Sequence, residues 1–172
     1  MRTQRPQKHN VWTGVVGDYI IGPFFIDGNL TGDKYLELLQ NQIIPTLRLL
    51  PINFEDIWFQ QDGCPAHNRR AVQNYLETTF NNKLISTRGT IKWPPRSPDL
   101  SPNDFFLWGY LKEEVYRHSF ERARNLEELR QKIIHFCGRI TPQQLRDMRL
   151  SLYNRFGYCL AERGGLFEPL LK

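Results

Sequence analysis

The pattern of hydrophobic and polar positions in the first fifty residues predicts a hairpin followed by a helix. Residues 10–27 contain two runs rich in valine, isoleucine and aromatic residues, separated by Gly17 and Asp18, a pair typical of tight turns. From Lys34 to Leu50, apolar residues recur at intervals of three and four, the spacing of one helical face. Pro45 is expected to kink or end the regular part of this helix.

The next segment predicts a strand, a tight turn and a second helix. Residues 57–59, Ile-Trp-Phe, are types that suit a packed β surface, and Gly63 and Pro65 interrupt any further pairing. From Asn68 the apolar residues return at helical spacing, at Val72, Tyr75, Leu76 and Phe80. The tryptophans Trp12, Trp58 and Trp108 are expected to belong to the core.

Helices are expected to dominate the rest of the chain. Residues 81–103 are rich in proline and predict an ordered loop, with one short strand at Leu84 and Ile85. A helix should then begin at Asp104, with an apolar stripe formed by Phe106, Leu107, Tyr110, Leu111 and Val115.

Capping patterns predict two more helices. Asn125 with Glu128 begins the first, and Thr141 with Pro142 and Gln144 begins the second. The second should end at Gly164 and Gly165, because glycine commonly terminates helices. These elements together predict one α/β domain with a helical carboxyl-terminal part.

Composition and charge narrow the classes of function. The 172 residues, 40% hydrophobic, are ample for one packed domain. The chain carries 23 Lys and Arg against 18 acids, a net charge of +5, which favours a polyanionic partner such as nucleic acid. No apolar run approaches the length of a membrane span, and the basic start does not resemble a signal peptide, so we expect an intracellular protein without membrane contact.

Asp62 is the first candidate for chemistry, because it follows the predicted strand at residues 57–59. In open α/β sheets, ligands gather at the carboxyl ends of strands, where a catalytic or metal-binding carboxylate would lie. The alternative is that Asp62 only caps the turn with its side chain.

Asp104 is the second candidate, and it also has two interpretations. It can act as the N-cap of the helix that follows, or it can share a metal ion with Asp62. Magnesium prefers oxygen ligands and is usually held by one or two carboxylates together with substrate phosphates. Asp99 competes for this role, and spacing alone does not separate it from Asp104.

Three segments resemble one known family, the Tc/mariner type of cut-and-paste DNA transposases. FQQDGCPAH is similar to the family's second-acid motif, and WPPRSPDLSPNDFFLWGYLKEEVY to its third-acid motif. VWTGVVGDYIIGPFFIDG resembles the strands between the first and second acids. The order of the segments also matches the family, and the later acid of SPDLSPND gives the third-acid role to Asp104. Forty-one residues, 63–103, separate Asp62 from Asp104 (104 − 62 − 1), and the better-known mariner spacing is shorter.

The resemblance implies an RNase H-like fold, with a mixed sheet and flanking helices, and a site that uses two Mg²⁺ or Mn²⁺ ions on Asp62 and Asp104. It also implies a DNA partner, a homodimer and a nuclear location. Within one partial domain, residues 1–9 would be a basic extension, 10–122 the remnant of the catalytic core and 123–172 the carboxyl-terminal helices. The expected activity is hydrolysis of a phosphodiester and joining of the freed 3′ end to target DNA.

The family's first acid has no counterpart in this sequence. It belongs to a strand that would precede VWTGVVG, where only the acid-free MRTQRPQKHN is present. We therefore expect an amino-terminally truncated domain that lacks the first strand of its sheet and is inactive alone. Asp18 and Asp27 are weak replacements, because both lie in turn-like settings beside glycine, where Asp is common for backbone reasons.

Several other residues could bind nucleic acid near the acids. Such side chains could hold phosphates or stack on bases, and the set is His67, Arg69, Arg70, Lys92, Trp93 and Arg96. The alternatives are a solvated helix face for the arginines, core packing for Trp93 and a structural hydrogen bond for His67. Two other functions compete with that of the transposase domain: a catalytically dead DNA-binding or interaction module derived from it, and a hydrolase acting on a small phosphate ester.

Overall fold

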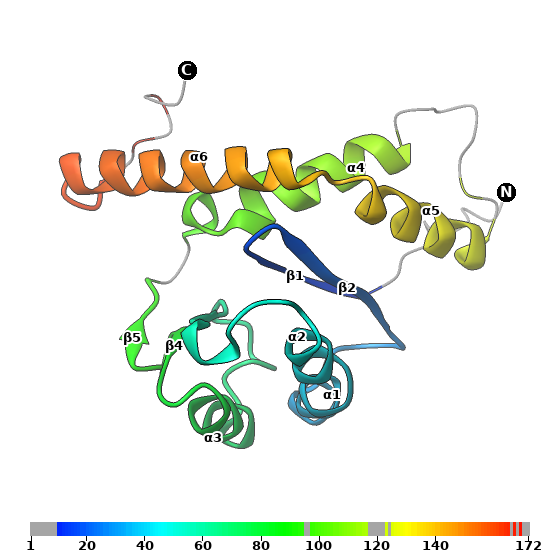
Figure 1. Ribbon diagram of the computed structural model, residues 1–172, viewed down its shortest axis with the longest axis horizontal. Coiled ribbons are helices and arrows are strands. Elements are labelled where there is room, and N and C mark those ends of the chain that lie inside the picture. The colour runs from blue at the N-terminus through cyan, green and yellow to red at the C-terminus, as the bar shows by residue number, and fades with distance from the viewer. Residues whose placement is uncertain are drawn as a thin grey trace, which may run out of the picture. The chain divides into compact units, whose positions relative to one another are not determined.

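The computed structural model describes residues 10–94, 97–116, 123, 125–165, 167 and 169 (Figure 1). The described chain forms two compact units, one made by the residues up to Phe25 and from Ser97 onward, the other by residues 26–96. The predicted basic extension at residues 1–9 and Arg96 lie outside the described residues.

The first unit contains the predicted hairpin. Strands β1 (Asn10–Val16) and β2 (Tyr19–Ile26) form a two-stranded sheet, joined by Gly17 and Asp18. Gly17 has a φ of 54°, a left-handed conformation that glycine adopts without steric cost. The hairpin prediction is therefore confirmed.

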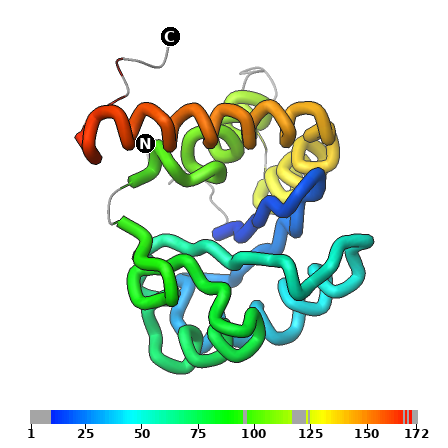
Figure 2. The backbone as a smooth tube through the Cα atoms, turned by 60° about the vertical axis from the view of Figure 1, so that its left-hand side comes forward, coloured from blue at the N-terminus to red at the C-terminus, as the bar shows by residue number. Residues whose placement is uncertain are grey.

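Helices form the rest of this unit (Figure 2). A 3₁₀ turn, η3 (Pro98–Leu100), and a π-helical turn, η4 (Asn103–Leu107), lead into α4 (Trp108–Tyr116). Helices α5 (Leu126–Gly138) and α6 (Pro142–Ala161) follow.

Both predicted caps are present in this unit, and α6 ends before the predicted glycines. Asn125 accepts a hydrogen bond from the Glu128 N–H at 2.8 Å, and Thr141 forms a reciprocal capping box with Gln144. After α6, the Gly164 N–H donates to the Cys159 carbonyl at 2.8 Å, with Gly164 at a φ of 82°. Helix α6 thus ends at Ala161, and the left-handed residue that directly follows its C-cap Glu162 is Arg163, with a φ of 53°, rather than a glycine.

The core of the first unit lies where α4, α5 and α6 meet. Its buried residues come from these helices and the turns beside them, and they are Leu107, Leu111, Cys137, Ile140 and Leu145. Val15 and Ile20 of the hairpin pack against this core. Burial raises the pKa of the Cys137 thiol to about 11, so this cysteine is a neutral packing residue.

The second unit begins with a helical segment in three parts. Helix α1 (Gly32–Leu38), the π-helical turn η1 (Leu39–Ile43) and α2 (Ile44–Arg48) follow without interruption. Pro45 was expected to kink or end the helix, and it lies in the first turn of α2, directly after the π-helical turn. Proline cannot donate the N–H that a position inside a continuous helix normally supplies, and the hydrogen-bonding pattern changes to that of a π-helical turn directly before it.

Three short parallel strands lie beside one helix in the second unit. The 3₁₀ turn η2 (Phe54–Asp56) precedes β3 (Phe59–Gln60), which pairs with β4 (Leu84–Ser86), and β4 pairs with β5 (Ile91–Lys92). The predicted helix is α3 (Arg70–Thr79), whose buried face includes Val72 and Leu76. Strand β5 was not predicted. The described strands thus form two sheets in an α/β fold.

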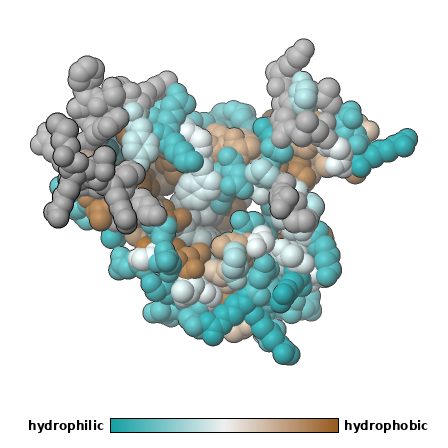
Figure 3. All heavy atoms as spheres, turned by 180° about the vertical axis from the view of Figure 1, so that it is seen from behind, coloured by the Kyte–Doolittle hydropathy of each residue, from teal (hydrophilic) through white to brown (hydrophobic). Residues whose placement is uncertain are grey.

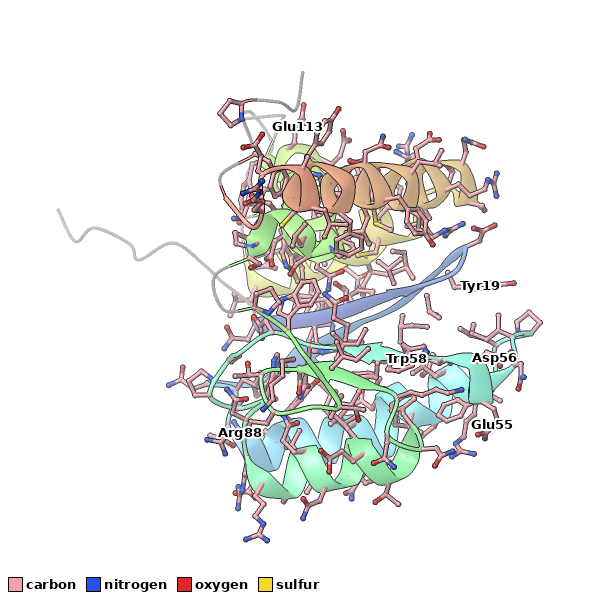
Figure 4. The ribbon with its side chains drawn as sticks, turned by 90° about the vertical axis from the view of Figure 1, so that its left-hand side faces the viewer. Tyr19, Glu55, Asp56, Trp58, Arg88 and Glu113 are labelled. Atoms are coloured by element: carbon pink, nitrogen blue, oxygen red, sulfur yellow. The ribbon has the colours of Figure 1, made fainter. Side chains whose placement is uncertain are left out.

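The predicted core position of Trp58 is wrong. Its side chain is 47% exposed, and it is labelled in Figure 4. Phe59 is buried instead, with its ring centroid 5.0 Å from that of Phe80. Strand β3 begins only at Phe59, so Trp58 lies outside it, in the segment between η2 and β3.

The outer surface of the second unit is largely hydrophilic on the face seen in Figure 3, where this unit occupies the lower part of the view. Among the described helices of either unit, none has both the length and the hydrophobicity that crossing a membrane requires.

Candidate metal and nucleic-acid site

Asp62 lies just beyond the carboxyl end of β3. The Gln61 N–H donates to the Ile85 carbonyl at 3.0 Å, which extends the pairing of β3 with β4 by one residue. The chain then leaves the sheet, and the Asp62 side chain is 59% exposed. A carboxylate is thus presented at the edge of a parallel sheet where ligands gather.

The two oxygens of Asp62 have different surroundings. Oδ1 accepts the Cys64 N–H at 3.1 Å and lies 2.7 Å from Nδ1 of His67. Oδ2 has no hydrogen-bond partner among the described residues. Capping the turn and binding a ligand were alternatives in the sequence, but the structure assigns the turn to Oδ1 and leaves Oδ2 open.

Electrostatics keep Asp62 ionised. The hydrogen bond from His67 lowers the pKa of the Asp62 carboxyl, partial burial opposes this effect, and the Cys64 N–H lowers the pKa further. Since an ionised carboxylate only accepts hydrogen bonds, Nδ1 of His67 is the donor. Asp62 therefore offers a negatively charged oxygen.

His67 is held by its neighbours rather than exposed to a ligand. Its ring centroid lies 4.4 Å from that of Tyr35, and its side chain is only 14% exposed. Its carbonyl accepts the side-chain amides of Gln61 at 3.3 Å and Gln73 at 2.7 Å. The structure favours the alternative role of His67 as a structural hydrogen-bonding residue.

Further polar residues, which were not predicted from the sequence, form hydrogen bonds with the two amides that hold the His67 carbonyl. The Tyr35 hydroxyl donates to Oε1 of Gln61 at 3.0 Å, and the Ser86 hydroxyl to Oε1 of Gln73 at 3.1 Å. The one available signal was Gln73, a polar residue on the apolar face of the helix between Val72 and Leu76.

The turn after β4 lies next to the turn that carries Asp62. A side chain added at Gly63 would place its Cβ 3.0 Å from Oγ1 of Thr87, so these two residues are in close contact. Arg88 is exposed on the same turn and is labelled in Figure 4. The ends of two neighbouring parallel strands thus place polar groups together.

Asp104 does not cap its helix. It lies within the first turn of η4, after Pro102, and no side-chain cap bond is formed at this helix start. Its backbone N–H donates to the Ser101 carbonyl at 2.9 Å, and its side chain is exposed. The N-cap interpretation of Asp104 is therefore wrong, since η4 starts at Asn103 and its N-cap position is Pro102.

Neighbouring side chains fix the turn that carries Asp104. Asn103 donates its amide to the Thr13 carbonyl of β1 at 3.0 Å. Arg155 of α6 donates to the Asp99 carbonyl at 3.1 Å and lies over the Phe105 ring, 4.2 Å from its centroid. Asp99 is half-buried in η3, whereas Asp104 is exposed.

The predicted nucleic-acid-binding residues have varied settings. Arg69 is exposed and forms an ion pair with Asp33. Arg70 is exposed at the start of α3, and Lys92 is exposed at the end of β5. Trp93 is half-buried. Asp62, His67 and these residues belong to the second unit, whereas Asp104 belongs to the first.

Comparison with known proteins gives one sequence relative and several structural ones. No family model matches the chain. The Tc3 transposase of Caenorhabditis elegans is 28% identical over 131 residues, which are 76% of this chain and 36% of that transposase. The chain therefore spans about a third of this relative's length.

Two solved structures of the Mos1 transposase have similar folds. One is its catalytic domain with raltegravir and Mn, with a TM-score of 0.73 and 18% identity over 93% of this chain and 83% of that chain. The other is its paired-end complex with the left transposon end, with a TM-score of 0.73 and 21% identity over 96% of this chain and 48% of that chain.

These likenesses confirm an α/β, RNase H-like fold of the kind found in transposase catalytic domains. Together with the sequence similarity to the Tc3 transposase, they support the catalytic domain of a Tc1/mariner transposase as the class of protein that this chain resembles. The resemblance seen in the motifs is therefore confirmed.

The residues around Asp62 fit a divalent metal ion, which this family implies. Oδ2 is an ionised and accessible carboxylate oxygen, the ligand type that Mg²⁺ and Mn²⁺ prefer. Within the described residues of either unit, no group of three or more His, Cys, Asp or Glu side chains is placed to hold an ion. Each acid on its own offers one carboxylate.

Proposed function

We propose that this chain is the catalytic core of a cut-and-paste DNA transposase, in which Asp62 and Asp104 are metal-binding carboxylates. The observation that carries the proposal is the open Oδ2 of Asp62 at the end of β3, in a chain 28% identical to the Tc3 transposase. The reaction is hydrolysis of a DNA phosphodiester, followed by joining of the freed 3′ end to a target strand.

The two acids act by holding charge in fixed positions. Oδ2 of Asp62 and the exposed carboxylate of Asp104 are the ligands that the chain contributes. When bound, Mg²⁺ or Mn²⁺ activates the attacking water and stabilises the leaving oxygen. His67 keeps Asp62 ionised and oriented, and the Asn103 and Arg155 contacts hold the turn of Asp104.

Two carboxylates position two metal ions poorly. We therefore propose that the chain is inactive unless a third carboxylate joins Asp62 and Asp104. Asp18, one candidate for a third carboxylate, is engaged by Arg146 and Arg149. These ion pairs favour a structural role for Asp18 in the hairpin turn.

DNA is the proposed substrate, and a homodimer in the nucleus is the proposed setting. The net charge of +5 and the exposed Arg70 and Lys92 favour contact with phosphates, and Trp93 offers a surface for stacking on bases. Support for the dimer comes from Mos1, whose related structures are paired-end complexes with transposon ends.

A second candidate function is a DNA-binding module without catalysis. The absence, among the described residues, of any group of three metal-binding side chains favours this candidate. Such a module binds DNA with an affinity that falls as salt rises, since released counterions drive the binding.

Nicking of supercoiled plasmid DNA in Mg²⁺ or Mn²⁺ tests the proposal. The purified chain should be compared with Asp62→Asn and Asp104→Asn, and Asp99→Asn is the matched control at the competing acid. Metal-dependent nicking that both variants lose and the control keeps would establish a working site. Without nicking, Mn²⁺ binding that both substitutions weaken would agree with a core that lacks its third carboxylate, whereas salt-sensitive DNA binding without Mn²⁺ binding would support the second candidate. Nicking that survives both substitutions would contradict the assignment of the acids.

A further inference from the structure

We infer that Gln73 is a positioning residue for Asp62, acting through His67 in a buried hydrogen-bonded network with Tyr35, Gln61 and Ser86. The network fixes His67 so that its ring engages Oδ1 of Asp62 and leaves Oδ2 for a cation. This inference rests on the proposed function only in giving Oδ2 a metal to bind.

The burial of the network requires that its bonds be made. Tyr35 is 1% exposed, Gln61 6%, Gln73 5% and Ser86 is fully buried. A buried polar group without a partner is costly, so these side chains occupy one bonded arrangement. Three elements, α1, α3 and β4, are thereby tied to the residues that follow β3.

Gln73 uses both ends of its amide and makes the shorter of the two side-chain bonds to the His67 carbonyl. Oε1 accepts the Ser86 hydroxyl at 3.1 Å, and Nε2 donates to the His67 carbonyl at 2.7 Å. Gln61 repeats this geometry, accepting from Tyr35 and donating to the same carbonyl at 3.3 Å. Two side-chain amides therefore donate to the His67 carbonyl, and each amide is oriented by a different hydroxyl, that of Tyr35 or that of Ser86.

Tyr35 acts on both parts of His67. Its ring packs against the imidazole with 4.4 Å between centroids, and its hydroxyl orients the amide of Gln61. Backbone and ring of His67 are fixed together, and Nδ1 is left with one acceptor, Oδ1 of Asp62 at 2.7 Å. Groups that orient a ligand in this way commonly change metal affinity about 10- to 100-fold when they are removed.

The test combines a spectroscopic signal of the metal-free chain with metal binding. The double variant Gln73→Met/Ser86→Ala removes both polar partners while nearly keeping the side-chain volumes. Tyr35→Phe removes only one hydroxyl, and Asn74→Ala changes the exposed neighbour on α3 as a control. The first readout is the proton resonance of the His67 Nδ1–H, identified by its loss in His67→Gln. The second is Mn²⁺ affinity, measured by electron paramagnetic resonance of the free ion.

The inference predicts a sharp Nδ1–H resonance in the native chain and in Asn74→Ala, its broadening or loss in the double variant, and about tenfold weaker Mn²⁺ binding there. Tyr35→Phe should show a smaller broadening of the resonance and a smaller loss of Mn²⁺ affinity. If the double variant does not fold, the result for Tyr35→Phe tests the inference in its place. An unchanged resonance in folded variants would overturn the inference. Native chain that shows the resonance but binds no Mn²⁺ would instead contradict the proposed function, so the two failures are distinguishable.

Discussion

The guanidinium of Arg155 lies over the ring of Phe105, with its central carbon 4.2 Å from the ring centroid. This contact joins the long helix α6 to the turn that carries Asp104. The same side chain donates to the Asp99 carbonyl at 3.1 Å. Arg155 therefore contacts the chain both before and after Asp104, the proposed third acid. The carboxyl-terminal helix is thus part of the support of the candidate site.

Replacing Arg155 should destabilise the first unit. Arg155→Met keeps most of the stem but loses the stacking and the charged hydrogen bond, and we expect a loss of about 1–2 kcal/mol in the free energy of unfolding. Arg155→Lys should not restore it, because an ammonium lacks the planar geometry. Urea unfolding measures the change, with Asn154→Ala, an exposed neighbour, as the control. Equal stability of Arg155→Met and the native chain would show that the contact is unimportant.

The two acids were located by motif, but their surroundings were not predictable from the sequence. Periodicity identified α3 and the apolar stripe of α4, because helical spacing repeats over several turns. It gave Asp104 an N-cap role, since a π-helical turn such as η4 has no distinct residue pattern. The buried amide of Gln73 was visible only as one polar residue on an apolar face.

Short strands were the other limit of sequence reasoning. β5 has two residues, Ile91 and Lys92, both exposed, so no alternation of apolar and polar residues marks it. Trp58 was assigned to the core on its residue type, yet its neighbour Phe59 takes the buried side. In strands this short, pairing partners distant in sequence decide which side is buried.

The ion pairs of Asp18 should make stability depend on pH. Hydrogen bonds from Arg149 and then Arg146 hold the pKa of the Asp18 carboxyl below its ordinary value, against some desolvation. The ionised form therefore stabilises the fold at pH values above about 3.9, and this contribution is lost as the pH falls through the lower folded-state pKa. We expect Asp18→Asn to be less stable than the native chain at neutral pH and the difference to shrink in acid. Thermal unfolding from pH 7 to pH 2 measures this; a difference that stays constant would contradict it.

Two glycines should respond in opposite directions to alanine. A Cβ at Gly89 would lie 2.5 Å from the Leu84 carbonyl oxygen and 2.9 Å from Oγ of Ser86, so Gly89→Ala should lose about 1–3 kcal/mol. At Gly109 of α4 a Cβ would meet nothing within 4 Å, and Gly109→Ala should gain about 0.5–1 kcal/mol from helix propensity. Unfolding midpoints in urea compare the pair. A gain in Gly89→Ala would contradict the close contacts of the turn after β4, and a loss in Gly109→Ala would contradict the open position on α4.

Leu107 should be critical for the core beneath Asp104. It is fully buried beside Leu111 and Leu145, so Leu107→Ala should cost about 2–5 kcal/mol. Leu150→Ala is the matched control on α6, where the side chain is 62% exposed, and it should change stability by less than about 0.5 kcal/mol. Similar losses in both variants, measured by denaturant unfolding, would argue against this core.

The most direct test of the proposal that Asp62 and Asp104 bind the same metal centre is a double-mutant cycle on Mn²⁺ affinity with Asp62→Asn, Asp104→Asn and the two combined. If both carboxylates bind the same metal centre, each single substitution weakens binding and the double variant loses less than the sum of the two, because either change already breaks the site. This is the result that the proposal predicts. Affinity unchanged by either substitution, or losses that simply add, would contradict a site shared by Asp62 and Asp104.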